Sequence, residues 1–133
     1  MLTKEMEIRS SERVELIDIT EELIQFIRST GVQEGLLTAF VPHTTASVIV
    51  NEGADPSVVK DIKYGLEKLF PHNDPAYRHQ EGNSAAHLKA SLLGPSIFLP
   101  VEEGYLKLGT WQAVFFAEFD GPRQRKLLLS LLV

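Results

Sequence analysis

The first thirty residues change from an alternating pattern of apolar and polar positions to a helical one. Segments 5–9 and 13–17 alternate, which predicts two short strands joined by a turn. Thr20 is followed by two acidic residues and then by apolar residues at helical spacing. Because a threonine side chain can cap free helix amides, we expect a helix that Thr20 caps and that ends at Gly31.

Two apolar runs and a second helix come next. The runs 35–41 and 46–51 are typical of buried strands, and the polar residues between them indicate a loop that contains His43. Asp55 is followed directly by a proline, which is a strong helix start because Asp caps free amides and proline suits the first helical position. The helical spacing of apolar residues continues toward Pro71, where we expect the helix to end.

The remainder of the chain predicts a loop, a short helix and four strands. Segment 71–83 is almost free of apolar residues and is typical of a surface loop, and Asn83 can cap a helix that ends at Gly94. Turn residues then separate four apolar segments that predict strands, namely 96–101, 105–109, 111–119 and 125–133. The last two are apolar enough that we expect burial on both faces.

The order of these elements favours one fold class. Strand pairs with interspersed helices, followed by consecutive strands, indicate an α+β protein rather than a doubly wound one. A length of 133 residues suits one domain of ordinary size. We therefore predict a single domain over residues 1–133, with a mixed, largely antiparallel sheet and about three helices.

Composition and charge narrow the range of functions. The chain has 13 Lys and Arg against 18 Asp and Glu, a net charge of -5, which disfavours non-specific binding to nucleic acid or to anionic membranes. It has no cysteine, so any metal must be held by His, carboxylates and carbonyls. No apolar run approaches the roughly 20 residues that cross a bilayer, and the start lacks an apolar signal segment. We expect a cytoplasmic protein.

Polar residues gather where the predicted strands end, which is where functional sites are often found. The common templates are absent, including the Gly-rich nucleotide loops, the Gly-x-Ser-x-Gly elbow and His-Glu-x-x-His. The polar groups instead comprise His43 to Thr45, Asn51 and Glu52, Gly109 to Gln112, and the loop residues His79, Glu81, Asn83 and His87. Two imidazoles of the last group would meet if the loop folds back on its helix.

Three segments of the chain resemble the YjbQ-like family. They are GLLTAFVPHTTASVIVNEGADPSVVKDI, YRHQEGNSAAHLKASLLG and LGTWQAVFFAEFDGPRQR, and the resemblance extends over nearly the whole chain. It implies a small α+β fold that assembles as a homotrimer, with a polar cleft at the positions of His43, His79 and His87. It also implies a thiamine-phosphate synthase side activity, beside a physiological reaction that is not settled.

The resemblance makes His43, His79 and His87 the expected metal ligands. Three neutral imidazoles can hold a divalent ion, most suitably zinc, and leave one position open for water or substrate. One alternative is a histidine cluster that binds phosphate directly, without a metal. The other is a set of surface or capping histidines.

Glu52 is the candidate catalytic residue. A carboxylate beside imidazoles can act as a general base or fix the tautomer of a ring, and the alternative is a solvated loop acid. Asp55 is better explained as the cap of its helix.

The candidate substrate-binding residues come from the matching positions and from the predicted helix start. They are Thr44, Asn51, Asn83, Ser84, Lys89, Thr110, Gln112 and Arg123. Asn83 and Ser84 open a helix whose free amides attract phosphate, and Lys89 and Arg123 would add positive charge. The alternatives are a solvated side chain for Lys89 and an ordinary ion pair for Arg123.

Two classes of function remain. The first is an enzyme that acts on a small phosphorylated or heterocyclic metabolite, a transferase if the side activity of relatives applies. The second is a non-catalytic protein that binds a metabolite or a metal. The expected homotrimer would bury apolar surface from segment 125–133, with Trp111, Phe115, Phe116 and Phe119 nearby, unless one core takes all of it.

Overall fold

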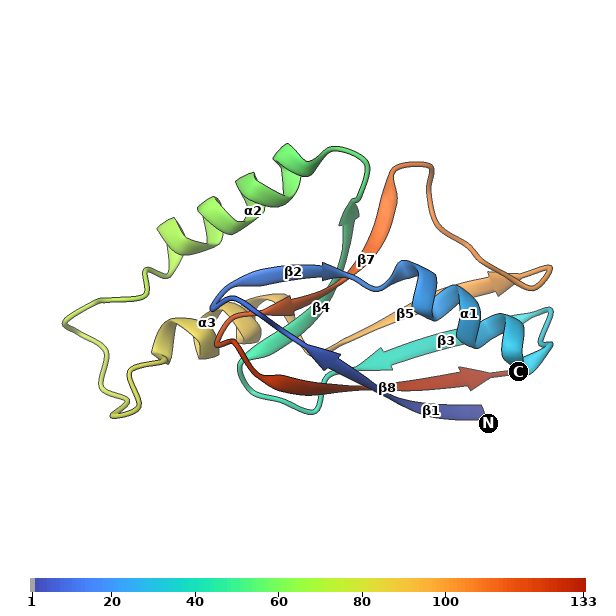
Figure 1. Ribbon diagram of the computed structural model, residues 1–133, viewed down its shortest axis with the longest axis horizontal. Coiled ribbons are helices and arrows are strands. Elements are labelled where there is room, and N and C mark those ends of the chain that lie inside the picture. Colours follow the sequence, from blue (N-terminus) through green and yellow to red (C-terminus); the bar gives the residue numbers. More distant parts are fainter. Residues whose placement is uncertain (1) are drawn as a thin grey trace.

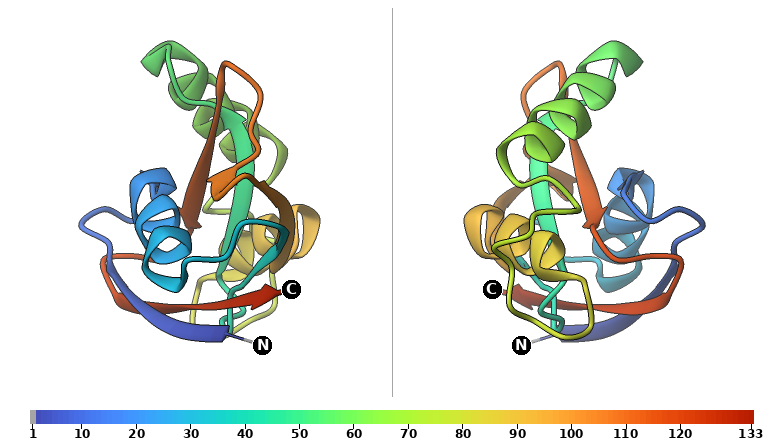
Figure 2. Two further views of the ribbon diagram at one scale, coloured as in Figure 1. Left: turned by 90° about the vertical axis from the view of Figure 1, so that its right-hand side faces the viewer. Right: turned by 90° about the vertical axis from the view of Figure 1, so that its left-hand side faces the viewer.

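Within residues 2–133, which the computed structural model describes, eight strands form two antiparallel sheets (Figure 1). The order of the five-stranded sheet is β1 (Leu2–Arg9), β8 (Gln124–Leu132), β3 (Gly35–Phe40), β5 (Ser96–Glu102) and β6 (Tyr105–Leu106). The order of the three-stranded sheet is β2 (Glu15–Asp18), β7 (Gln112–Glu118) and β4 (Ala46–Glu52). Figure 2 shows β1 and β8 along the bottom of the molecule and β4 and β7 standing above them.

Three helices complete the fold of the described residues. They are α1 (Thr20–Thr30), α2 (Pro56–Leu69) and α3 (Ser84–Leu93). Helix α1 packs its apolar side into the main core, whereas α2 buries only Leu66 and projects from the sheets in Figures 1 and 2. Helix α3 lies against β4, and the hydroxyl of Ser47 donates a hydrogen bond of 3.2 Å to the carbonyl of Ala90. The predicted α+β class, with three helices and antiparallel strands, is confirmed.

The core lies between the two sheets because each sheet turns one apolar face inward. Along β3 and β5, alternate residues are buried, such as Leu37 and Leu99. The central strand β7 is buried on both faces, as predicted. Strand β8 alternates instead, so the expectation of burial on both faces is wrong for this strand: its outward residues, including Leu132, stay partly or fully exposed.

Local signals at the helix ends have mixed outcomes. The carboxylate of Asp55 accepts a hydrogen bond of 2.9 Å from the amide of Ser57, so this cap is confirmed, and Gly31 ends α1 in the left-handed conformation. Thr20 does not cap α1. Its hydroxyl donates to Asp18 and accepts from the amide of Val114, which ties the helix start to β7.

The first two strands differ from the expectation of a simple strand pair. An irregular segment with a bend at residues 12–14 joins them, but β1 pairs with β8 and β2 pairs with β7, so they belong to different sheets. The chain therefore crosses from one sheet to the other near Ser10. This crossing brings Ser10 next to the end of β7 and the start of β8. Among residues 2–133, no helix is long and apolar enough to span a membrane.

Candidate active site: a histidine cleft

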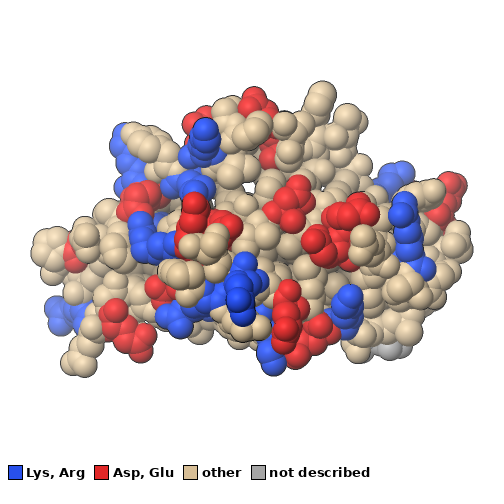
Figure 3. All heavy atoms as spheres, viewed as in Figure 1, with Lys and Arg blue, Asp and Glu red and all other residues tan. Residues whose placement is uncertain are grey.

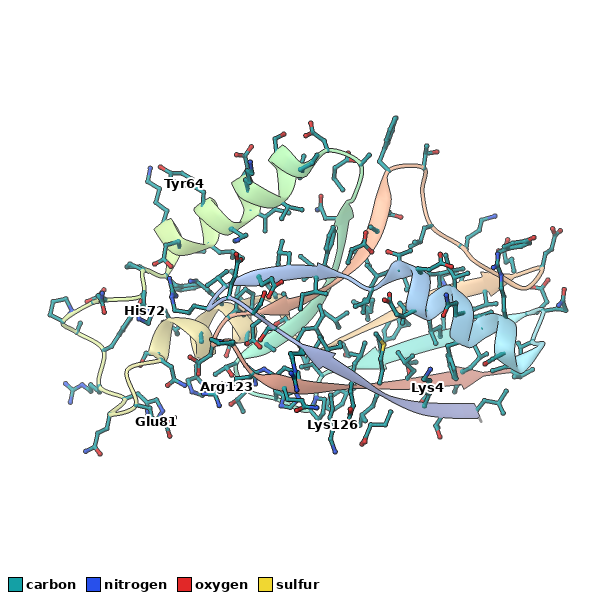
Figure 4. The ribbon with its side chains drawn as sticks, viewed as in Figure 1. Lys4, Tyr64, His72, Glu81, Arg123 and Lys126 are labelled. Atoms are coloured by element: carbon teal, nitrogen blue, oxygen red, sulfur yellow. The ribbon has the colours of Figure 1, made fainter. Side chains whose placement is uncertain are left out.

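Loops at one end of the sheets surround a cleft of about 500 Å³, which we call the histidine cleft. Its walls come from the β3–β4 loop, the loop before α3 with the first turns of that helix, and the β7–β8 turn with the start of β8. The lining residues are Pro42, His43, Thr44, Thr45, His79, Glu81, Asn83, His87, Asp120, Arg123 and Arg125. Figure 4 labels Glu81 and Arg123 at this end of the molecule. The three predicted histidines thus share one cleft.

His43 is held in one tautomer by a backbone hydrogen bond. Its Nε2 accepts a bond of 2.9 Å from the amide of Lys126, at the start of β8. A nitrogen that accepts this proton carries none of its own, so the neutral ring has its hydrogen on Nδ1. Partial burial and the positive charge of Arg125 lower the pKa of His43 below its ordinary value. Neutral His43 is therefore a hydrogen-bond donor through Nδ1.

His79 and His87 form a pair on another wall of the cleft. Their ring centroids lie 5.2 Å apart, and the planes meet at 84°, an edge-to-face arrangement. His87 is on the first turns of α3, and His79 is in the loop before it, so the loop does fold back on the helix as expected. Nε2 of His79 is 4.0 Å from a carboxylate oxygen of Glu81.

Arg125 is the most deeply set cation of the cleft, and the sequence did not single it out. It is 5% exposed and occupies an inward position of β8, in line with Leu127 and Leu129. Its Nε donates a bond of 2.8 Å to Glu118, and its Nη2 donates to Glu118 and, at 2.8 Å, to the hydroxyl of Thr45. These bonds leave Nη1 for the cleft that Arg125 lines.

Glu118 fixes the position of Arg125 from behind the cleft. It is fully buried at the end of β7 and also accepts hydrogen bonds from the Ser10 hydroxyl at 2.7 Å and the Asp120 amide at 3.0 Å. Burial raises the pKa of the Glu118 carboxyl, but the bonds from Arg125, Asp120 and Ser10 outweigh it, so the pKa is lower than usual. The pair is therefore ionised at neutral pH.

The β7–β8 turn carries Arg123, the cation that the sequence did predict. Its Nη2 lies 2.9 Å from a carboxylate oxygen of Asp120, and its Nε donates to the Asp120 carbonyl at 2.8 Å. The ion pair that stood as the alternative for Arg123 is thus present, and the side chain is half exposed at the rim of the cleft.

Asn83 is a second point of interest in the cleft wall. It precedes α3 as predicted, but its Oδ1 accepts no capping bond from the helix amides, and its Nδ2 donates to Asp120 at 2.8 Å. Its Oδ1 is buried and has no hydrogen-bond partner among the described residues. A buried acceptor without a donor is costly, so a bound ligand that brings an N–H or O–H group would satisfy it.

A three-histidine metal site does not appear in this arrangement. Among residues 2–133, no three His, Asp or Glu side chains gather closely enough to hold one ion. His43 in particular does not fit the predicted ligand set, because its Nε2 already accepts the Lys126 amide and its Nδ1 carries the hydrogen.

Four predicted site residues lie elsewhere, at the opposite end of the β4–β7 pair. We call them the distal polar cluster: Asn51, Glu52, Thr110 and Gln112. Glu52 pairs in register with Gln112, whereas Ala46 at the other end of β4 pairs with Glu118 beside the cleft. The expectation that Glu52 lies beside the imidazoles is therefore wrong within one chain, because β4 carries it away along its whole length.

Lys89 and Ser84 also lie outside the histidine cleft. Lys89 is fully buried on α3, where its Nζ is 3.2 Å from a carboxylate oxygen of Glu67 on α2. It therefore joins two helices and is neither the solvated residue nor the cleft cation considered from the sequence. Ser84 lines a neighbouring hollow on the other side of the two paired histidines.

Charge on the face viewed in Figure 3 is mixed, with acidic and basic side chains interspersed. In the histidine cleft, the cations Arg123 and Arg125 each have an acidic partner. Such a site would select a small anion by geometry rather than by a broad positive field.

Comparison with known proteins places the chain among close relatives. The family model described as UPF0047 protein YjbQ-like matches residues 4–133. The UPF0047 protein YugU of Bacillus subtilis is 43% identical over 131 residues, which cover 98% of this chain and 99% of that protein. A UPF0047 protein of Methanocaldococcus jannaschii is 46% identical over 126 residues, covering 95% of this chain and 91% of that protein.

Solved structures agree with this assignment. A protein of Clostridium acetobutylicum from the same family superposes with a TM-score of 0.94 at 46% identity and covers 97% of this chain and 99% of its own. A hypothetical protein of Aeropyrum pernix also gives a TM-score of 0.94, at 37% identity, and covers 99% of this chain and 98% of its own. From the matched sequence and the shared fold, the chain is a member of the YjbQ-like UPF0047 family.

Proposed function

We propose that the protein is an enzyme that acts on a small phosphorylated metabolite bound in the histidine cleft. The observation that carries this proposal is the buried Arg125–Glu118 pair, which sets a guanidinium edge in the cleft beside three histidines. Burying two charges is expensive, and some proteins retain such a pair because it positions a functional group. Imidazoles near an anion can also move protons at neutral pH.

The chemistry of the walls defines what the ligand must offer. Nη1 of Arg125 and Nδ1 of neutral His43 are donors, which suits the oxygens of a phosphate. The buried Oδ1 of Asn83 is an acceptor and requires a donor from the ligand. A phosphate ester that carries an O–H or N–H group meets both requirements. His79 and His87 are the candidates for proton transfer, because within residues 2–133 neither ring is fixed by a backbone bond as His43 is.

Zinc binding, which the sequence analysis predicted, remains a prediction within this proposal. His79 and His87 are close enough to face one ion together, but His43 would first have to release the Lys126 amide. Elemental analysis of the purified protein decides this point. A stoichiometric metal that is lost in a His79→Asn variant would support a two-histidine site.

Assembly of the chain as a homotrimer is likewise part of this proposal. Phe115, Phe116 and Phe119 cannot contribute to it, because the core of a single chain already buries them. The outward face of the five-stranded sheet instead exposes apolar residues on three neighbouring strands, among them Phe40, Phe98 and Leu132. Light scattering at micromolar concentration should give the mass of three chains, and a monomer mass would reject the trimer.

The test of function begins with ligand binding. Methyl phosphate and inorganic phosphate are titrated into the full chain by calorimetry, and phosphorylated metabolites are then screened by thermal shift and for turnover, with thiamine-phosphate synthase activity among the assays. A His87→Asn variant should lose turnover, whereas His72→Asn, the same change outside the histidine cleft, should not. Saturable binding without turnover for any metabolite would favour the non-catalytic binding protein, and no phosphate binding would reject a phosphorylated ligand in either class.

A further inference from the structure

A second hollow lies against the histidine cleft and shares a wall with it. Its volume is about 420 Å³, and it is bordered by the His79–His87 pair together with Ala76, Tyr77, Arg78, Ser84 and Leu88. The same two histidines line the histidine cleft. We call this second space the aromatic hollow, since three of its bordering side chains are rings.

The loop that forms the aromatic hollow is held by its own hydrogen bonds. The hydroxyl of Tyr77 donates a bond of 2.9 Å to the carbonyl of Pro71, which fixes the ring from its far end. Asp74 accepts from the amide of Ala76 at 2.9 Å, and its carbonyl accepts from the amide of Tyr77 at 3.1 Å. Burial raises the pKa of the Tyr77 hydroxyl, and the negative charges of Asp74 and Glu67 raise it further. The hydroxyl therefore keeps its proton and remains a donor.

The two hollows differ in chemistry although they adjoin. The histidine cleft presents guanidinium, imidazole, amide, hydroxyl and carboxylate groups, whereas the aromatic hollow adds a tyrosine ring, a methyl group and the exposed side chain of Leu88, with Arg78 and Ser84 as its polar border. Leu88 is 38% exposed on α3, directly after His87. Each hollow falls within the usual size of small-molecule pockets, roughly 300–1,000 Å³.

We propose that the aromatic hollow is the subsite for a flat apolar ring, and that the ligand is an aryl or heteroaryl phosphate ester that spans the His79–His87 pair. This inference rests on the proposed function, because the phosphate of such an ester would occupy the histidine cleft. The ring would pack between Tyr77 and Leu88, and the ester oxygen would lie beside the paired imidazoles. Selectivity for aromatic over short aliphatic phosphates then comes from this subsite alone.

The test compares two probes that differ only in the group attached to phosphate. Phenyl phosphate and methyl phosphate are titrated into the full chain by calorimetry. Phenyl phosphate should bind about tenfold more tightly or better, since burying an aromatic ring in an apolar pocket favours binding. The Leu88→Gln variant should lose most of this preference while its affinity for methyl phosphate stays unchanged.

Leu92 provides the matched control on the same helix. It is 56% exposed, one turn beyond Leu88, and does not border the aromatic hollow. Leu92→Gln should leave the preference for phenyl phosphate intact. Equal affinities of the two probes in the unmodified protein, or equal loss in both leucine variants, would overturn the subsite and leave the proposed function standing. Failure of both probes to bind would instead overturn the proposed function.

Discussion

The two ends of the β4–β7 strand pair both carry polar side chains, but the chain holds them in different ways. At the histidine cleft, hydrogen bonds join distant residues: Ser10 donates to Glu118 across 108 positions, and Arg125 donates to Thr45 across 80. At the distal polar cluster, the side chains of Asn51 and Gln112 accept from backbone amides one and three positions away. The first set exists only in the folded chain, whereas the second forms within a turn.

This contrast separates a positioned site from ordinary turn chemistry. The residues of the first network are buried, and their mutual hydrogen bonds hold Arg125 in place with Nη1 left for the cleft. Asn51, Thr110 and Gln112 are exposed, and Glu52 accepts from the nearby Ala54 amide. Polar side chains of that kind commonly stabilise turns. The histidine cleft is therefore the better candidate for chemistry within one chain.

The largest expected effect comes from breaking the buried pair. Arg125→Met leaves Glu118 charged and buried without its partner, so the free energy of unfolding should fall by about 3–5 kcal/mol. Gln112→Met at the distal polar cluster removes one exposed local hydrogen bond and should change the free energy of unfolding by less than about 0.5 kcal/mol. Urea denaturation measures both. Similar losses of unfolding free energy in the two variants would contradict the contrast between the histidine cleft and the distal polar cluster.

Acid should weaken the protein through the same carboxylate. The pKa of Glu118 is lower in the folded chain than its ordinary value of 4.5, so the unfolded chain takes up the proton first as pH falls. The stabilisation is complete above that ordinary value and is lost as pH falls through the folded pKa. Denaturation curves between pH 7 and pH 3 should show this loss in the unmodified protein and a flatter acid region in Glu118→Gln.

The titration and the tautomer of His43 should test the arrangement of the histidine cleft. The pKa of His43 in the folded chain is lowered from the ordinary 6.5, so the unfolded chain takes up this proton first as pH falls. The stabilisation from neutral His43 is therefore lost as pH falls below that value. Nitrogen NMR at neutral pH should show the hydrogen on Nδ1 and a bare Nε2. A ring with both nitrogens protonated at pH 7 would contradict the hydrogen bond from Lys126.

The smallest effect is expected for Glu52. Because Glu52 lies at the other end of β4, Glu52→Gln should leave the affinity for methyl phosphate within about twofold of the unmodified protein. Calorimetry measures the affinity, and light scattering on the same samples reports assembly. A tenfold loss in an intact oligomer would show that Glu52 of a neighbouring subunit reaches the histidine cleft, and the catalytic role predicted from the sequence would then stand.

Sequence alone determined the features that depend on neighbours within a few residues. Asp55 before Pro56 begins α2, Gly31 ends α1, and the alternation over segments 5–9 and 13–17 marks the strands β1 and β2. These signals are local because capping groups and side-chain alternation act over one to four positions. The shared cleft of His43, His79 and His87 came from the resemblance to relatives rather than from spacing.

Tertiary structure decided which polar residues meet. The charge of Arg125 at an inward position of β8, in step with Leu127 and Leu129, was a readable signal, but its partners are 7 and 80 positions away, at Glu118 and Thr45. The same applies to Glu52, which is near His43 in sequence and at the far end of a strand in space. Strands advance by about 3.3 Å per residue. Seven positions along β4 are therefore enough to keep Glu52 away from the histidine cleft, although the sequence suggested that they lie together.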